Sequence, residues 1–331
     1  MRHRISVLMD NRFVEIIQLI KQSRRNALAA VNAELINLYW TIGEHISLKI
    51  ATSEWGNAVV RQLAEAIQMN EPELKGFSDK NLWRMKQFYE TYRGNPKLST
   101  LLREISWTNN LLILSRCKTM DEKEFYLKHT IQEKYSKREL DRQISVSLFE
   151  RTMTGNSKLS PVVRESKKSL SNTFKDSYVF EFLNLPEPHN EGDLQRGLVS
   201  QMKNFILELG KDYLFIAEQY KIQVGNSDFF IDLLFYHRGL QCLIAIELKA
   251  DKFKPEHLGQ LNFYLEALDR DVKKECENPS LGVLLCQYKD HEVVEYALSR
   301  GLSPTMISEY KLHLPDKKIL QHRFRELMNN Q

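Results

Sequence analysis

The apolar residues of this chain change their spacing about halfway along its 331 residues. In the first half they recur every three or four positions, as from Ile16 to Ile42, which is the spacing of one face of an α-helix. In the second half they gather in short runs rich in β-branched and aromatic residues, which is typical of strands. The pattern predicts an all-α N-terminal part, followed by a part in which strands and helices alternate.

The N-terminal half contains a series of predicted helices. Their ranges are 12–48, as one long helix or two, 57–69, 79–92, 121–134 and 137–152, the last with basic residues near its start. Ser78 and Ser136 stand where N-capping residues belong. The pair 57–69 and 79–92 loosely resembles a DNA-reading helix-turn-helix, although its connection is longer than the usual turn. An ordinary helical hairpin is the alternative.

The C-terminal half predicts five strands and three helices. The strands are 213–224, 229–236, 242–248, 282–287 and 304–310, and the helices are 191–210, 255–268 and 291–299. This alternation predicts an α/β or α+β domain with a mixed central sheet flanked by helices. Residues 153–172 are polar, with Gly155 and Pro161, which indicates a linker. We therefore expect a helical domain over 1–152 and a second domain over 173–331.

Two carboxylates interrupt apolar strand runs. Asp232 lies within the first strand of a predicted hairpin and Glu247 within the second, with His237 expected to be exposed in the turn. Burying a lone carboxylate is costly, so a shared divalent cation would account for both acids. Lys249 lies two residues after Glu247 and therefore on the same face of its strand. A pair of acids exposed at strand ends, or bound to Lys249, is the alternative.

A predicted helix follows the hairpin and carries Gln260 and Tyr264 one turn apart. Asp232, the Glu247-Leu248-Lys249 triplet and Gln260-x-x-x-Tyr264 resemble the PD-(D/E)XK nuclease superfamily, in its branch with a Q-x-x-x-Y element. The runs DFFIDLLFYHR, IELKADKFKPEHLGQLNFYLEALD and MISEY more closely resemble the YhcG-like family, over nearly the whole chain. In that family a nuclease domain follows a helical domain of uncertain function. The proline that often precedes the first Asp is Ile231 here.

The resemblance implies a restriction-endonuclease-like fold and metal-dependent hydrolysis of DNA. Asp232, Glu247 and the carbonyl of Leu248 would hold Mg²⁺, with Mn²⁺ as a second possible ion. Lys249 would orient the attacking water, and Gln260 and Tyr264 would support the water or the DNA strand. In several superfamily members a Glu at the start of the preceding helix joins the metal, a role that falls here to Glu191. The helix dipole alone is another reason for an acid at that position.

Charge is divided unevenly between the halves. Residues 1–155 carry 24 Lys and Arg against 18 Asp and Glu, whereas the remainder carries 23 against 25. The N-terminal part is therefore the expected DNA surface. Candidate phosphate contacts are Lys80, Arg84, Lys86, Lys137 and Arg138. Salt bridges within the helices are the alternative explanation for these side chains.

Other features narrow the class of protein without fixing its biology. The four cysteines have no paired spacing and no apolar run is long enough to span a membrane, so we expect a cytoplasmic protein in a reducing compartment. A non-cleaving DNA-binding module and a protein-interaction scaffold remain alternatives to a nuclease. Partner proteins from defence or repair, and a homodimer, are both compatible with the sequence. The sequence does not specify the form of the DNA, or DNA rather than RNA.

Overall fold

The computed structural model describes residues 11–52, 55–154, 174–299, 303–314 and 319–320. Contacts within the chain define two compact units, Met1–Asp141 and Arg142–Gln331. The predicted linker 153–172 lies almost entirely outside the described residues, with only its first two residues at the end of a helix. Each unit is described by itself below.

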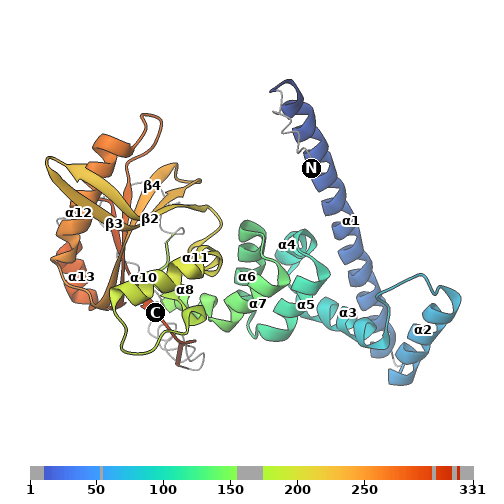
Figure 1. Cartoon of the computed structure of the whole chain (residues 1–331). Helices are drawn as coiled ribbons and strands as arrows, with labels where there is room; N and C mark the ends of the chain where they lie inside the picture. The colour runs from blue at the N-terminus through green and yellow to red at the C-terminus, as the bar shows by residue number, and fades with distance from the viewer. Residues whose placement is uncertain (1–10, 53–54, 155–173, 300–302, 315–318, 321–331) are drawn as a thin grey trace, which may run out of the picture. The chain divides into compact units, whose positions relative to one another are not determined.

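The N-terminal unit is helical, as predicted (Figure 1). Its first predicted helix is a single element of 41 residues rather than two. The helices are α1 (Asn11–Ala51), α2 (Asn57–Asn70), α3 (Asp79–Tyr92), η1 (Pro96–Leu98), α4 (Ser99–Glu104), α5 (Trp107–Arg116), α6 (Met120–Glu133) and the first half of α7 (Lys137–Ser145). Among the described residues, no helix is both long enough and apolar enough to cross a membrane.

The C-terminal half of α1 packs closely against α3. Ile36, Tyr39 and Ile46 are buried on α1, and Leu82 and Met85 are buried on α3. At the crossing, a Cβ atom on Gly43 would lie 2.1 Å from the backbone oxygen of Met85, so only glycine fits there. The core of this unit therefore forms around one half of α1.

The second unit is built on a six-stranded sheet in the order β1-β6-β5-β4-β3-β2. The strands are β1 (Ser177–Val179), β2 (Tyr213–Val224), β3 (Ser227–His237), β4 (Cys242–Lys252), β5 (Leu281–Tyr288) and β6 (Thr305–Lys311). β2, β3 and β4 pair antiparallel, whereas β4, β5, β6 and β1 pair parallel. The sheet is mixed, as predicted. The prediction missed β1 because a three-residue strand carries almost no periodic signal.

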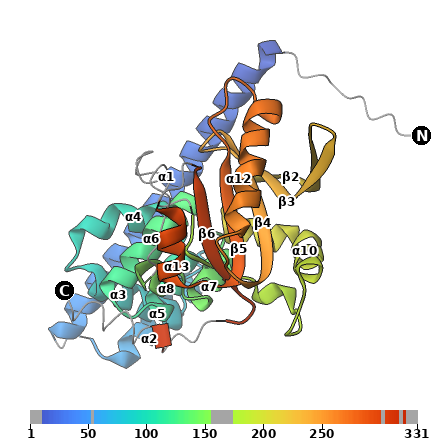
Figure 2. The same ribbon diagram turned by 90° about the vertical axis from the view of Figure 1, so that its left-hand side faces the viewer.

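Helices cover both faces of this sheet (Figure 2). On one face, α10 (Glu191–Ser200) and α11 (Met202–Leu209) bury Leu194, Leu198 and Phe205 against β4. These helices were predicted as one, but the chain leaves helical geometry at Gln201. On the other face, α12 (His257–Ala267), extended by η3 (Leu268–Val272), and α13 (His291–Leu298) pack on β4 and β5. The short helix η2 (Glu181–Leu183) follows β1.

The second half of α7 and the helix α8 (Leu148–Thr154) belong to the second unit. The sequence predicted one continuous helix here, but Ser147 has a φ of 54° and separates the two. Arg142 on α7 and Arg151 on α8 both contact the carboxylate of Glu208 on α11, with the shortest distance 2.8 Å from Arg142 Nη1 to Oε2. Lys175 Nζ lies 3.4 Å from Glu208 Oε1.

These three cations determine the charge state of the buried Glu208. Burial alone would raise the pKa of Glu208, but Lys175, Arg151 and Arg142 together lower it to about 2. Burial, together with repulsion by the two arginines, lowers the pKa of Lys175 to about 8. The pKa values of Glu208 and Lys175 are both lowered, because three cations lie around one carboxylate.

We expect Glu208→Gln to lower the free energy of unfolding by about 3–5 kcal/mol at pH 7, because it leaves buried cations without their counter-charge. Denaturant unfolding of the full chain measures this. The pKa of Glu208 is lower in the folded than in the unfolded chain, so its contribution is present above pH 4.5 and is lost as the pH falls towards 2. The difference between wild type and variant should shrink over that interval.

The matched control is Glu266→Gln, which removes an exposed partner of Arg270 on the surface of the same unit. It should change the free energy of unfolding by less than about 1 kcal/mol. Equal effects of the two variants would show that the Glu208 cluster does not hold α7 and α8 to this unit.

Candidate active site

The two strand carboxylates lie where β3 and β4 separate. The last paired residues of this ladder are Leu233 and Ile246, so Asp232 and Glu247 come directly next on their strands. Leu248 points to the opposite face and is buried among the residues under α10 and α11. Glu247 is only 2% exposed. The hairpin therefore brings the two acids together, as its sequence predicted.

Hydrogen bonds from three elements hold Asp232 in place. Its Oδ2 accepts from the backbone N–H of Leu248 at 2.9 Å, and its Oδ1 accepts from Gln219 Nε2 at 3.0 Å. The backbone oxygen of Asp232 accepts from Gln195 Nε2 at 3.1 Å. Gln219 also donates to Gln195 Oε1 at 3.1 Å. The carboxylate is thus oriented by β4, β2 and α10 together.

Gln219 lies opposite Asp232 in the β2–β3 register and has a φ of 44°, in the left-handed region. A non-glycine residue there is strained, and such residues concentrate at functional sites. The neighbouring β2 residue, Glu218, is exposed. Gln195 was missed, because nothing in a helix sequence shows that its amide reaches a strand backbone.

Lys249 lies between two acids. Its Nζ is 3.0 Å from Glu247 Oε1 and 3.4 Å from Glu191 Oε2 at the start of α10. Burial alone would lower the pKa of Lys249, but the charge and hydrogen bond of Glu247 raise it. The ammonium is therefore kept charged beside the carboxylate pair.

One ammonium does not neutralise this site. Burial first, and then the charge of Asp232, raise the pKa of Glu247 to about 7. Burial also raises the pKa of Asp232, although the Leu248 N–H and the charge of Lys249 oppose the shift. The two carboxylates repel each other in a poorly solvated position, which a further positive charge would relieve.

The site fits a divalent cation. Glu247 Oε2 is buried and has no hydrogen-bond partner among the described residues. Carboxylate oxygens are ligands that Mg²⁺ prefers, and this ion keeps several waters instead of taking a full set of protein ligands. Within the described part of the chain, no group of three or more His, Cys, Asp or Glu side chains is arranged to hold a metal. Two carboxylates and a carbonyl are the donor set that the sequence predicted.

The predicted pair on the following helix is also present. On α12, Gln260 Nε2 donates to the hydroxyl of Tyr264 at 2.7 Å. Tyr264 is buried, and its pKa is raised by burial first and then by the charges of Glu247 and Asp232, despite its bond to Gln260. The Gln260 side chain is exposed.

His237 differs from the expectation of an exposed turn residue. It is buried at the end of β3, where its ring lies 4.9 Å from that of Tyr213. Its Nδ1 accepts a hydrogen bond from the backbone N–H of Leu240 at 3.1 Å, which closes the turn. His237 has a structural role at the hairpin end remote from Asp232.

The basic residues predicted on the N-terminal unit are not equivalent. Lys80 and Arg84 on α3 and Lys137 and Arg138 at the start of α7 are exposed. Lys86 is less free, because it pairs with Glu90 at 2.7 Å and lies 5.8 Å from the Trp83 ring. Four of the five candidates can therefore reach a phosphate without breaking an ion pair among the described residues.

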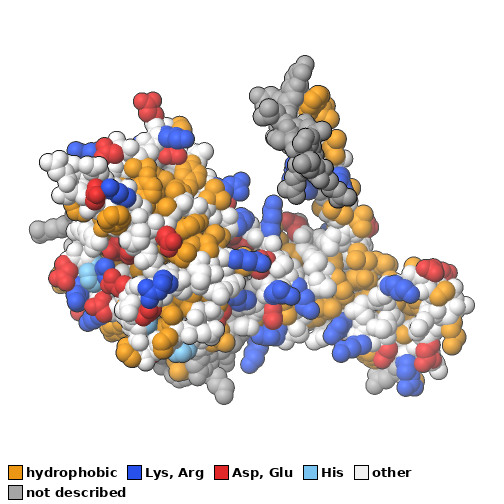
Figure 3. Space-filling model, in the orientation of Figure 1, with side chains coloured by type: hydrophobic (Ala, Val, Ile, Leu, Met, Phe, Trp, Pro, Cys, Tyr) orange, Lys and Arg blue, Asp and Glu red, His pale blue; other side chains and the backbone are white. Residues whose placement is uncertain are grey.

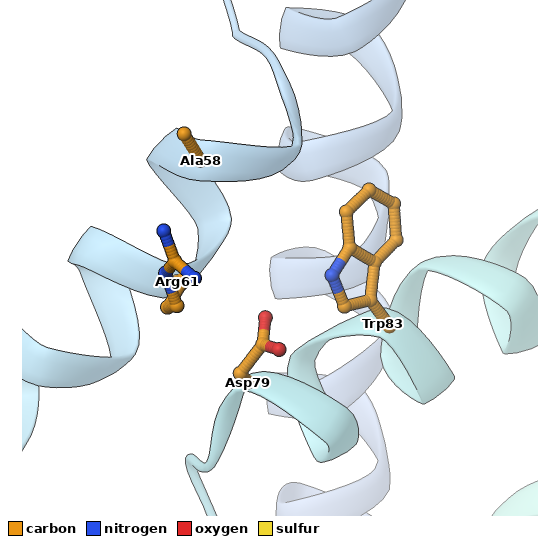
Figure 4. A pocket seen from close by; sticks show the side chains of 4 residues that line it. All are labelled: Ala58, Arg61, Asp79 and Trp83. Carbon is orange, nitrogen blue, oxygen red and sulfur yellow. The ribbon is translucent and has the colours of Figure 1, made fainter.

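A hollow of about 490 Å³ lies next to this surface, between α2 and α3 (Figure 4). It is lined by Ala58 and Arg61 on α2 and by Asp79 and Trp83 on α3. Figure 4 shows the Asp79 carboxylate and the Trp83 ring directed into the space below Ala58. The hollow is open and belongs to the N-terminal unit, so it is separate from the carboxylate site.

An Asp on one strand, Glu-x-Lys on the next and a Gln-Tyr pair on the following helix define a PD-(D/E)XK nuclease site. Comparison with known proteins agrees. Residues 171–325 match the family model of the YhcG PDDEXK nuclease domain, and residues 15–151 match that of the DUF1016 N-terminal domain. The chain therefore contains a YhcG-type PDDEXK nuclease domain that follows a DUF1016 N-terminal domain.

One relative aligns with nearly all of this chain. The Escherichia coli (strain K12) protein named "Putative nuclease YhcG" is 29% identical over an alignment 342 positions long, which covers 92% of this chain and 90% of that protein. The crystal structure of a repair endonuclease from Pyrococcus abyssi overlaps 40% of this chain and 50% of its own, with a TM-score of 0.28 and 15% identity. An overlap this small supports no argument about activity.

We expect the metal-free protein to lose stability as the pH rises from about 4.5 to about 7. Glu247 has a higher pKa when folded, so the folded chain binds more protons than the unfolded chain in that interval. Between pH 5 and pH 8, with a chelator present, wild type should lose about 1–3 kcal/mol more than Glu247→Gln. Denaturant unfolding at the two pH values measures the difference.

The control for this experiment is Glu218→Gln, which changes an exposed acid on β2. It should follow the wild-type pH dependence. At pH 8, added Mg²⁺ should raise the free energy of unfolding of wild type by more than that of Glu247→Gln. An identical pH dependence of wild type and Glu247→Gln would contradict the buried, repelling pair.

Proposed function

We propose that this protein is a Mg²⁺-dependent deoxyribonuclease that hydrolyses phosphodiester bonds. The observation that carries the proposal is the incompletely neutralised acid pair, in which Glu247 Oε2 is buried without a partner beside Asp232. A structural ion pair would satisfy its own oxygens, whereas a metal site leaves them available. This argument separates a nuclease from a non-cleaving module that has kept only the fold.

Asp232, Glu247 and the carbonyl of Leu248 would hold the ion, with Glu191 as a fourth ligand. Mn²⁺ has similar ligand preferences and would substitute for Mg²⁺. When bound, the ion supplies Lewis-acid chemistry to the phosphodiester. The amides of Gln219 and Gln195 keep Asp232 in one orientation, which reduces the reorganisation needed before reaction.

Lys249 is the cation next to the acid pair. Its ammonium, fixed by Glu247 and Glu191, would orient the attacking water and stabilise charge that develops on the phosphate. Gln260 is exposed on α12 and bonded to Tyr264, so it would contact the DNA strand or order a water. Tyr264 would hold Gln260 in that position.

DNA is the proposed substrate, and the basic side chains of a second surface support a nucleic-acid partner. The exposed Lys80, Arg84, Lys137 and Arg138 would bind the backbone without reading its sequence. Defence against foreign DNA and DNA repair are both settings for such an activity, alone or with partner proteins. Incubation with labelled duplex, single-stranded and branched DNA and with RNA, each with Mg²⁺, Mn²⁺ or Ca²⁺, tests substrate and ion together.

Asp232→Ala should abolish cleavage and weaken Mg²⁺ binding, because one of two shared carboxylates is lost. Lys249→Ala should retain the ion but lower the cleavage rate by roughly two to four orders of magnitude. Gln260→Ala should reduce cleavage with little change in Mg²⁺ affinity. Single-turnover cleavage and calorimetric Mg²⁺ titration measure the two effects separately.

Lys254→Ala is the matched control, since Lys254 is an exposed lysine five residues away that pairs with Asp251. It should cleave at a rate close to wild type. Undiminished cleavage by purified Asp232→Ala would assign the activity to another site or to a contaminant.

The double variant Lys80→Glu/Arg84→Glu should bind DNA more weakly, with a salt dependence shallower by about two phosphate contacts. The control is Lys97→Glu/Lys128→Glu, which makes the same charge change at two exposed lysines that pair with Glu124. Fluorescence anisotropy at several salt concentrations measures both slopes. Equal slopes for the two double variants would remove α3 from the DNA surface.

A further inference from the structure

The first half of α1 has no partner among the described residues of its own unit. Every described side chain from residue 18 to residue 31 is exposed, and this part of the helix extends beyond the other helices of its unit (Figures 1 and 2). It is nevertheless rich in large apolar residues. Phe13, Ile16, Leu19, Ile20, Leu28 and Val31 are 54–71% exposed. Hydrophobic side chains are visible along this part of α1 in Figure 3.

Six apolar residues of α1 belong to one stripe with coiled-coil spacing, which four polar residues complete, whereas Ile16, Leu19 and Leu28 lie outside it. Alternating steps of four and three residues run without a break through Phe13, Ile17, Ile20, Arg24, Ala27, Val31, Glu34, Leu38, Thr41 and His45. Ile17 is half-buried and the other nine are exposed. At 1.5 Å per residue the stripe is about 48 Å long. The opposite face, with Ile36, Tyr39 and Ile46, is the one that packs on the rest of the unit.

The stripe is complementary to itself when two copies run antiparallel. If a twofold axis passes residue 29, each stripe residue meets a residue of the other copy, and the two residue numbers add up to 58. Phe13 then meets His45, Ile17 meets Thr41 and Ile20 meets Leu38. Ala27 meets Val31 next to the axis, where small side chains permit close approach. Every position of the stripe has a partner within the stripe, which is the condition for a symmetric interface.

The charges select the same arrangement. Arg24 is basic and Glu34 is acidic, and neither forms an ion pair with another described residue. In the antiparallel register Arg24 of one copy meets Glu34 of the other, twice. In a parallel pair Arg24 would meet Arg24 and Glu34 would meet Glu34, which is unfavourable.

We propose that this chain forms a homodimer through an antiparallel coiled coil of α1, in the register that pairs Arg24 with Glu34. A second copy explains both the apolar stripe and its two charges. It also explains why a helix continues for some twenty residues without tertiary contacts, because an unsupported helix of this length is marginal in water. This inference is independent of the nuclease proposal.

A charge-swap series on the full chain tests the register. Arg24→Glu and Glu34→Arg should each weaken dimerisation by about tenfold or more, because both create like-charge contacts. The double variant Arg24→Glu/Glu34→Arg should return to within about threefold of wild type. Sedimentation equilibrium measures the three dissociation constants, and circular dichroism confirms that each variant is folded. Arg25→Glu, which changes an exposed basic residue beside the stripe, is the control.

Disulfide trapping gives an independent answer on direction. In a Cys276→Ser background, the single variants Ala27→Cys and Val31→Cys are oxidised separately and as a mixture. Antiparallel pairing predicts a covalent dimer in the mixture and little in either variant alone. A covalent dimer in each variant alone would indicate parallel pairing and overturn the register.

A monomeric wild type at tens of micromolar would overturn the proposal, and the stripe would then serve a different protein. A dimer that is indifferent to all three charge variants would place the interface elsewhere. Cleavage activity is measured on the same preparations. An inactive dimer would count against the nuclease proposal alone, and an active monomer would count against the dimer proposal alone.

Discussion

The candidate site of the second unit depends on the repulsion between the buried carboxylate of Glu247 and the half-buried carboxylate of Asp232. The two acids occupy adjacent positions at the end of a strand pair, and Lys249, 3.0 Å from Glu247 Oε1, is the one described cation in contact with the pair. The pKa of Glu247 rises to about 7 as a result. The packing of the sheet, α10 and α12 compensates for the free energy of this repulsion. A divalent ion that binds between the acids would relieve the repulsion.

The same unit contains the opposite arrangement. At Glu208 three cations share one carboxylate, and its pKa falls to about 2. That cluster is satisfied and joins α7 and α8 to the sheet domain, whereas the Asp232–Glu247 pair is unsatisfied and faces the proposed substrate. A chain truncated within residues 155–173 would remove Arg142 and Arg151 and leave Glu208 buried with one of its three partners. The nuclease domain therefore begins functionally before the predicted linker.

The sequence predicted the elements whose signals are local. The long helix, the hairpin and the mixed sheet follow from apolar spacing, and the Asp232, Glu247 and Lys249 cluster follows from acids within apolar strands. Long-range contacts left no such signal. Gln195 lies 37 positions before Asp232 in the chain and donates a hydrogen bond to its backbone oxygen. Gln219 donates to the Asp232 carboxylate, and its own positive φ could not be predicted from the sequence. His237 was misplaced because a turn sequence does not show that tertiary packing buries the ring.

Proton release on Mg²⁺ binding is the most direct test of the unsatisfied acid pair. Calorimetric titrations of the full chain in buffers of different ionisation enthalpy give the number of protons released. At about pH 6.5 Glu247 is mostly protonated when metal-free, so binding should release close to one proton, falling towards zero near pH 8.5. Glu247→Gln should remove the release. Mg²⁺ binding without proton release at the lower pH, or unchanged release in Glu247→Gln, would contradict the account.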